Sequence, residues 1–199
     1  CCWKHGPTPA SYSWIIDPTP PAVSIDSPAA GSWQNGNFTV QYDATDANIS
    51  TCKLFTNNSA GWLDRGSITC GVDQTTTINI SAWCTAEGVN TCGVRIWAQD
   101  AAANTAQAER FFSIDTTPPV VSISSPPAGS WQNSDFDVLY SATGANLCKL
   151  FTKNGAAGWA DQGSITCGVN LTKLIDISAW CTTEGLNQCG VRIWALDEP

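Results

Sequence analysis

The same unit occurs twice in this chain of 199 residues, and this repeat constrains its fold more than any other feature. The two copies of each conserved segment lie 96 to 98 residues apart. Such a repeat indicates that each copy is an independent building block, and about 100 residues is an ordinary domain size. The shared segments are AGSWQN (30–35 and 128–133), CKLFT (52–56 and 148–152), GSITCGV (66–72 and 163–169), ISAWCT (80–85 and 177–182) and CGVRIWA (92–98 and 189–195).

Each copy has the pattern of a β-sheet domain. Phe38, Val40 and Tyr42 alternate with polar residues, which is the period of a strand with one buried face. Gly, Asn, Asp and Pro interrupt such segments every 8–12 residues, as turns do. The pattern predicts an all-β fold with a two-sheet sandwich in each copy. The first copy is expected to have strands at about 22–28, 37–45, 50–57, 61–70, 75–83, 91–99 and 108–115.

The last of these strands, in AERFFSIDTTPP, has no counterpart after CGVRIWALDEP in the second copy. Residues 10–25, ASYSWIIDPTPPAVSI, instead align without a gap on residues 108–123, AERFFSIDTTPPVVSI. We therefore expect the N-terminus of one subunit to complete the second domain of the next. The expected division is a donor strand segment at 1–17, a first domain at 18–116 and an incomplete acceptor domain at 117–199.

In this donor strand the residues expected to face the acceptor core are Tyr12, Trp14 and Ile16, which align on Arg110, Phe112 and Ile114. Burying three such side chains contributes about 5–9 kcal/mol before any cost is counted. Strand addition is an established mode of recognition, and a head-to-tail contact that does not close produces a filament. The subunit is thus expected to bind itself. Two alternatives stay open: a fragment of a longer tandem array, and a strand folded back within its own chain.

The ten cysteines indicate an oxidising compartment. Eight fall in two matching sets, whereas a zinc site would need close pairs and no C-x-x-C occurs. Four cysteines allow three pairings in each domain, and proximity favours Cys52–Cys70, Cys84–Cys92, Cys148–Cys167 and Cys181–Cys189. The other two, Cys1 and Cys2, are candidates for disulfides between subunits.

A more specific signal is the motif D-x-T-P-P followed by V-S-I and then, late in the copy, VRIWAQDAAANT. It resembles the tandem immunoglobulin-like domains of prokaryotic cell-surface and secreted proteins, from about residue 10 to 197. The resemblance implies two tandem Ig-like sandwiches and an extracellular structural or adhesive role, with surface glycans or other cells as further partners. It implies no ligand, because this fold hosts many functions.

Surface modification and sugar binding are further expectations. Five N-x-S/T sequons suit glycosylation of a secreted chain: Asn37, Asn48, Asn57, Asn79 and Asn170. Ten tryptophans raise the alternative of a carbohydrate-binding module, for which Trp33 and Trp131, in turn-like segments, are the surface candidates. Repeated Trp in a sandwich is more often core.

Composition excludes several other classes. A net charge of −8 with nine scattered Lys and Arg argues against nucleic acid, and no apolar run reaches the length of a membrane span. His5 is the only histidine, and no catalytic or nucleotide-binding motif occurs. The Asp-rich stretch at 43–48 matches no defined calcium loop. The expectation is a protein without enzyme activity, metal or cofactor.

Overall fold

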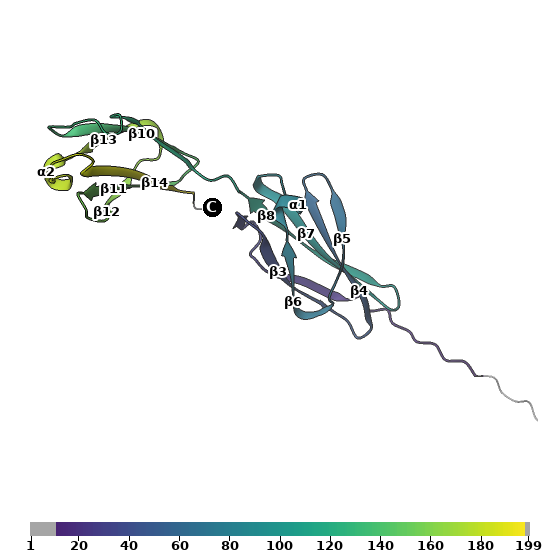
Figure 1. Ribbon diagram of the computed structural model, residues 1–199. Helices are drawn as coiled ribbons and strands as arrows, with labels where there is room; N and C mark the ends of the chain where they lie inside the picture. Colours follow the sequence, from purple (N-terminus) through teal and green to yellow (C-terminus); the bar gives the residue numbers. More distant parts are fainter. Residues whose placement is uncertain (1–10, 198–199) are drawn as a thin grey trace, which may run out of the picture. The chain divides into compact units, whose positions relative to one another are not determined.

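The computed structural model describes residues 11–197 and is all-β apart from two single-turn helices (Figure 1). The chain divides into two compact units between Asp115 and Thr116. The sequence places this boundary one residue later, between 116 and 117, within the same proline-containing segment. The part before the division is called unit 1 and the part after it unit 2.

Unit 1 consists of two sheets that face each other across one core. The first has the order β1-β3-β6 and the second β2-β8-β7-β4-β5. Every pairing is antiparallel except that of β2 with β8, which is parallel. The elements are β1 (Ala22–Ser27), β2 (Trp33–Gln34), β3 (Phe38–Thr45), β4 (Ile49–Asn58), β5 (Trp62–Ile68), β6 (Gly71–Ile78), α1 (Ile80–Trp83), β7 (Gly88–Asp100) and β8 (Thr105–Ile114).

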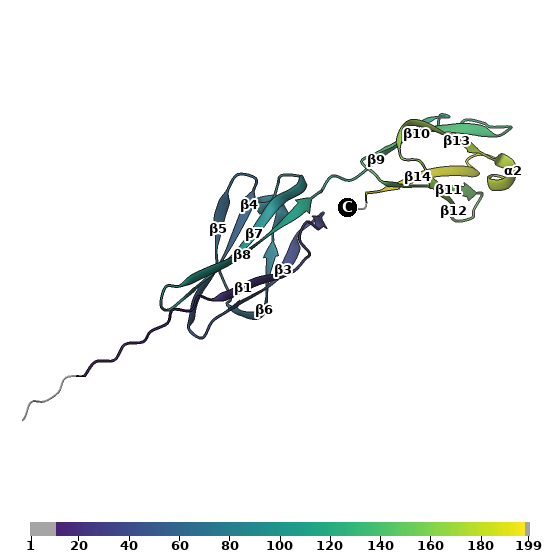
Figure 2. The same ribbon diagram turned by 180° about the vertical axis from the view of Figure 1, so that it is seen from behind.

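Unit 2 has the same arrangement with two strands fewer. Its sheets have the orders β13-β10-β9 and β12-β11-β14 (Figure 2). Among the described residues of this unit, neither β2 nor β8 has a counterpart. The elements are β9 (Val120–Ser125), β10 (Phe136–Thr143), β11 (Leu147–Asn154), β12 (Ala160–Ile165), β13 (Gly168–Ile175), α2 (Ile177–Trp180) and β14 (Cys189–Leu196).

The alternating pattern of β3 explains how the core forms. Phe38, Val40, Tyr42 and Ala44 are all buried, while the residues between them are exposed or half-buried. Successive side chains of a strand point to opposite faces, so one apolar face meets the other sheet. The same alternation recurs in β10, where Val138 is buried.

One predicted strand is wrong at its end. The alternation through Thr76, Ile78 and Ile80 predicts a strand to residue 83, but β6 ends at Ile78 and a helical turn follows. Asn79 causes the change, since its Oδ1 accepts a hydrogen bond from the N–H of Ala82 at 3.2 Å, a typical N-cap. Asp176 caps α2 in the same way. The predicted strands also did not include β2 or the first four residues of β6.

Each unit contains two disulfides, and the four bonds are the pairs that proximity in the sequence favours. Within unit 1, one joins β4 to the residue just before β6, and so connects the two sheets. The other closes the connection between α1 and β7. The pairs are Cys52–Cys70, Cys84–Cys92, Cys148–Cys167 and Cys181–Cys189.

Candidate functional site

The site is best understood from strand β8 of unit 1, because this strand completes the core there. Phe112 and Ile114 are fully buried, and the Phe112 ring packs edge-on against Phe38 with 4.8 Å between ring centroids. On one side β8 pairs with β7, where Phe112 lies opposite Cys92. On its other side it pairs with β2. One strand thus joins two others and covers the end of the core.

In unit 2 the corresponding positions are uncovered. Among the described residues, β14 pairs with β11 alone, so its other edge has no partner strand there. Ile123 is 42% exposed, whereas its repeat partner Ile25 is 5% exposed. Cys189 is exposed although Cys92 is buried, and Ile193 is the one buried residue of β14. We call this edge of β14, with the apolar side chains beside it, the open edge.

A second uncovered segment belongs to the same region by its repeat position. Trp131 is 76% exposed, against 37% for Trp33. In unit 1, Trp33 and Gln34 form β2 and pair with Ser113 and Ile114 of β8, but residues 131–132 form no strand. The two segments that flank β8 in unit 1 are β7 and β2, and in the described part of unit 2 neither β14 nor residues 131–132 has a strand in the place of β8.

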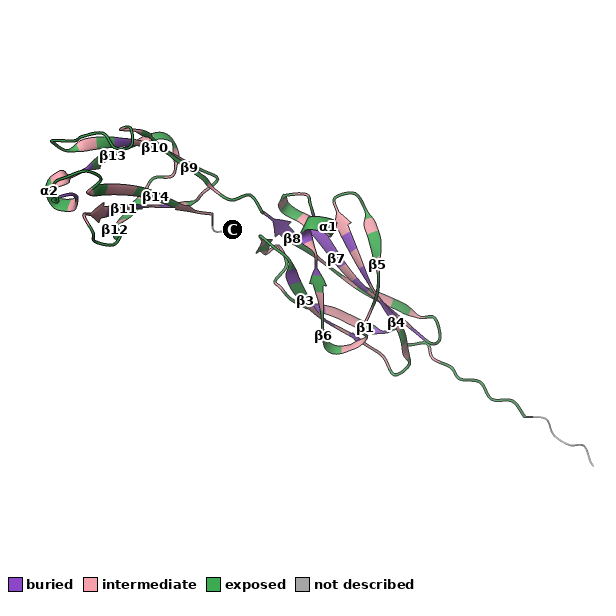
Figure 3. Ribbon diagram, in the orientation of Figure 1, coloured by how far each residue is buried: buried purple, intermediate pink, exposed green. Residues whose placement is uncertain are grey.

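The N-terminal segment, residues 11–16, is exposed and forms no strand (Figure 3). Tyr12, Trp14 and Ile16 are each at least four-fifths exposed, and so is Ile15, which sequence reasoning did not single out. Contiguous exposed apolar side chains are a feature of interaction surfaces, which makes this segment a candidate for one. These are the side chains that the sequence assigns to the donor strand.

The N-terminal segment is anchored at its C-terminal end to unit 1. Asn104 donates from Nδ2 to the carbonyl oxygen of Asp17 at 2.8 Å and to that of Thr19 at 3.4 Å. Asn48 donates to the Asp17 carboxylate at 3.2 Å. Residues 17–19 are therefore held on the loops of unit 1, whereas residues 11–16 are solvent-exposed.

Three carboxylates gather at this anchor. Asp17, Asp46 and Asp100 each place one oxygen within 4.8 Å of the others, and oxygens of this kind are the ligands that calcium prefers. They also serve the loops: Asp100 accepts from the N–H groups of Ala102 and Asn104, both at 2.8 Å. These hydrogen bonds give the cluster a structural role in shaping the loop after β7. The sequence analysis predicts no metal site at these residues.

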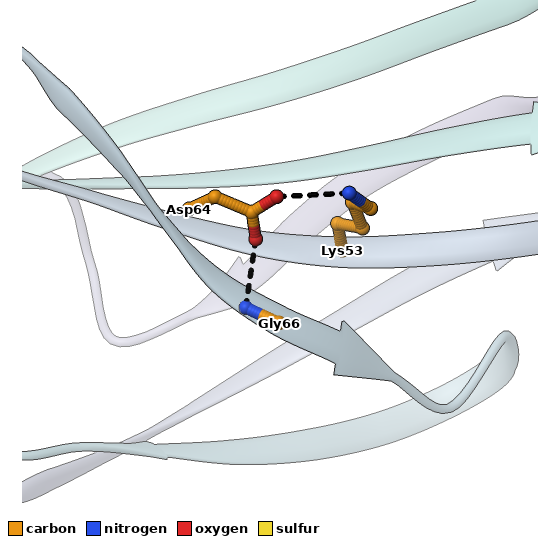
Figure 4. Close-up of polar contacts among 3 residues, drawn as sticks. All are labelled: Lys53, Asp64 and Gly66. Carbon is orange, nitrogen blue, oxygen red and sulfur yellow. Dashed lines mark hydrogen bonds and ion pairs between the residues drawn. The ribbon is translucent and has the colours of Figure 1, made fainter.

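The β4–β5 hairpin of unit 1 and the β11–β12 hairpin of unit 2 each carry a cross-strand ion pair. Lys53 Nζ lies 2.8 Å from Asp64, whose other oxygen accepts from the N–H of Gly66 at 2.7 Å (Figure 4). These hydrogen bonds hold the pKa of Asp64 below its ordinary value. Lys149 and Asp161 repeat the arrangement at 2.9 Å, with the same effect on the pKa of Asp161.

The sequons differ in how their amides are used. Asn37, Asn57 and Asn79 accept backbone hydrogen bonds through Oδ1, which does not involve Nδ2, the atom that would carry a glycan. Asn48 uses Nδ2 itself to donate to Asp17. Asn170 is exposed. Geometry therefore makes Asn48 the least suitable of the five acceptors.

Two further predictions concern disulfides between subunits and sugar binding. Cys1 and Cys2, the candidates for disulfides between subunits, lie outside the described residues. Trp33, one of the two candidate sugar-binding tryptophans, lies in β2 and pairs through its backbone with Ser113 of β8, so its backbone belongs to the sandwich. In residues 11–197, no helix is long and apolar enough to cross a membrane.

Comparisons with known proteins give only distant likenesses. No protein-family model matches the sequence, and no curated protein matches it either. Two solved structures are similar over 89% of this chain. One is dimeric latent PorU from Porphyromonas gingivalis, with 15% identity and a TM-score of 0.36. The other is a tetra-tandem repeat in the extending region of a large adhesion protein, with 18% identity and a TM-score of 0.32.

The chain spans 17% of the first of these proteins and 49% of the second, less than half of either. At these identities and scores the likeness does not extend to function.

Proposed function

We propose that this chain is a structural subunit of an extracellular filament and has no enzyme activity. The strand order of unit 1 is similar to that of an Ig-like sandwich, a fold that serves as a building block, and this supports the proposal. The four disulfides support an extracellular location, because such bonds persist in oxidising compartments.

One observation carries the proposal. Unit 2 has an open edge, and the exposed residues 11–16 align with β8, the strand that covers the corresponding edge of β7 in unit 1. The N-terminal segment has the alternation of β8, with Trp14 and Ile16 at the positions of the buried Phe112 and Ile114. An uncovered sheet edge beside apolar side chains favours the addition of a strand.

A neighbouring copy supplies this strand in the proposed assembly. Its N-terminal segment inserts at the open edge of unit 2, and its own unit 2 accepts the next copy. The contact joins two different surfaces of the chain, so it is heterologous and propagates. The result is a polymer of sandwiches in which each unit 2 is complete.

A second candidate is a pair of repeats within a longer array of an adhesin or another surface protein. The repeat itself favours this reading, because every unit in such an array is completed by the strand that follows it in the same chain. In such an array, a strand that follows unit 2 in the same polypeptide pairs with its open edge. The N-terminal segment then completes the repeat that precedes unit 1.

Electron microscopy and size-exclusion chromatography over a range of concentrations distinguish the two. Three chains are compared: the full chain, a chain lacking residues 1–17, and a chain in which the sequence of residues 101–115 follows Asp197. In the third chain, the added copy of β8 is expected to pair with β14 of the same chain, as β8 pairs with β7 in unit 1. It controls for any general loss of solubility caused by the exposed N-terminal segment.

The filament proposal expects polymers from the full chain only. A full chain that stays monomeric at high concentration would overturn it. If the extended chain then shows a more stable unit 2 by thermal unfolding, the array reading takes its place. An extension that leaves the stability of unit 2 unchanged would rule out a strand site in both.

A further inference from the structure

We infer that the strand site of unit 2 is a two-walled slot, with β14 on one side and residues 131–132 on the other, and that it takes residues 11–16 of a second copy in one defined register. This inference rests on the proposed function and adds to it the pairing of individual residues. It also assigns a role to Trp131, whose side chain is largely exposed in the single chain.

The register of β8 in unit 1 provides the template. On the β7 side, Phe112 lies opposite Cys92 and Glu109 lies opposite Arg95. Each residue of the N-terminal segment has a number 98 lower than its counterpart in β8, and each residue of β14 has a number 97 higher than its counterpart in β7. In the slot, Trp14 therefore lies opposite Cys189. The remaining pairs on this side are Ser13 with Gly190, Tyr12 with Val191 and Ser11 with Arg192.

The second wall follows from β2. Trp33 and Gln34 pair in parallel with Ser113 and Ile114, and the N–H of Gly31 donates to the carbonyl oxygen of Phe111 at 2.8 Å. Transferred by the repeat, Trp131 lies beside Ile15, and the N–H of Gly129 donates to the carbonyl oxygen of Ser13. The added strand then has hydrogen bonds on both edges and exposes neither.

The inward side chains supply enough surface for a specific contact. A buried Tyr or Trp removes about 150–250 Å² from water, so Tyr12, Trp14 and Ile16 together remove roughly 500 Å². Counting both partners gives about 1,000 Å², which is where specific interfaces begin. Backbone pairing on two walls adds to this. The segment is therefore large enough to join two copies of the chain.

Two positions on the face opposite the core differ between β8 and the N-terminal segment: Glu109, which is exposed, and Ser113, which is buried. In unit 1, Arg95 pairs with Glu109 at 2.7 Å and stacks on the Trp62 ring, with its guanidinium carbon 4.1 Å from the centroid. Arg192 stacks on Trp159 at the same distance, and the register places Ser11 where Glu109 stands. At Ile15 the segment differs from its template, since Ser113 there accepts from the N–H of Asn90 and donates to Gly31.

Charge substitutions in the full chain test the register. Ser11→Glu restores the carboxylate opposite Arg192, and we expect it to lower the critical concentration for assembly about two- to fivefold, the usual range for a partly exposed ion pair. Ser11→Lys raises the critical concentration, and combining it with Arg192→Glu restores assembly. Ser13→Glu is the matched control, because it adds the same charge two residues away and lowers the critical concentration only if the strand is shifted by two.

Hydrogen exchange tests the second wall. Exchange of the Gly129 amide slows on assembly if residues 129–132 line the slot. Assembly with an improvement from Ser13→Glu instead of Ser11→Glu would overturn the register but not the strand exchange. Assembly with unchanged exchange at Gly129 would remove the second wall. A full chain that forms no polymer would overturn the proposed function, and the register would fall with it.

Discussion

The Tyr42 hydroxyl donates a hydrogen bond to the carbonyl oxygen of Thr69 at 2.7 Å. It links β3 to the residue before Cys70 and thus reinforces the disulfide that joins the two sheets of unit 1. Unit 2 repeats the bond, from Tyr140 to Thr166, at the same length. A phenol whose ring lies in the core while its hydroxyl reaches a loop carbonyl is a specific device for fixing that loop.

Replacing Tyr42 by Phe removes this hydrogen bond and leaves the ring in place. We expect unit 1 to lose about 1 kcal/mol of unfolding free energy, measured by urea denaturation. Tyr140→Phe is the matched change in unit 2. If Tyr42→Phe leaves stability unchanged, the hydroxyl does not fix the loop.

The same tyrosines predict a stability loss in alkali. Burial raises the pKa of Tyr42 above its ordinary value of 10.0, and that of Tyr140 likewise. The neutral phenol is favoured in the folded state, so this contribution is complete below pH 10 and disappears as the pH rises through the raised pKa. Melting temperatures measured from pH 8 to 12 should fall less steeply in Tyr42→Phe than in the parent chain.

Removing the disulfides separately should cost different amounts of stability. The Cys52–Cys70 pair closes a separation of 18 residues and Cys84–Cys92 one of 8. Restriction of the unfolded chain predicts losses of about 3 kcal/mol for the first pair and somewhat less for the second when both partners become Ala. Thermal unfolding of the two double variants gives the order, and a larger loss for the short loop would contradict this account.

Phe112→Ala should make unit 1 resemble unit 2. The ring is fully buried and packs on Phe38, so its removal is expected to cost about 3–5 kcal/mol. Phe111, the next residue on β8, is the control, because it is partly exposed and contacts the Trp62 ring 5.9 Å away. Equal losses for the two Ala variants in chemical denaturation would show that β8 does not complete the core.

Acid should weaken both hairpins through Asp64 and Asp161. Each carboxyl has a lowered pKa because it accepts from a Lys ammonium and a backbone N–H. A lowered folded pKa gives stability that is present above the ordinary value of 3.8 and is lost as the pH falls through the folded pKa. The double Asp→Asn variant should therefore show a flatter stability profile between pH 2 and 5. An unchanged profile would contradict the assignment.

The sequence predicts the strands well where one face is uniformly apolar. Phe38, Val40 and Tyr42 alternate without interruption, and β3 begins and ends where the pattern does. At Ile80 the same alternation misleads, since the decisive residue is Asn79, whose side chain bonds to the backbone and starts a turn. The two-residue strand β2 has no periodicity to detect, because parallel pairing with β8 produces it.

The candidate site could be predicted only in part. Tyr12, Trp14 and Ile16 are recognisable because they align with a strand of the repeat. The exposure of Trp131 agrees with its turn-like segment, but the smaller exposure of Trp33 could not be foreseen, since the two have the same immediate sequence neighbours. The difference between the two tryptophans comes from strand β8, which is far from Trp33 in the sequence.

The disulfides also limit how far a unit can lengthen under a pulling force. A unit stretched from its two ends releases chain as its strands detach, but the segments closed by Cys52–Cys70 and Cys84–Cys92 cannot straighten. At the length of an extended residue, they withhold roughly 90 Å of contour length in each unit. Such a unit would be a short, stiff element in a loaded chain, whose extension is set by covalent bonds after its hydrogen bonds have broken.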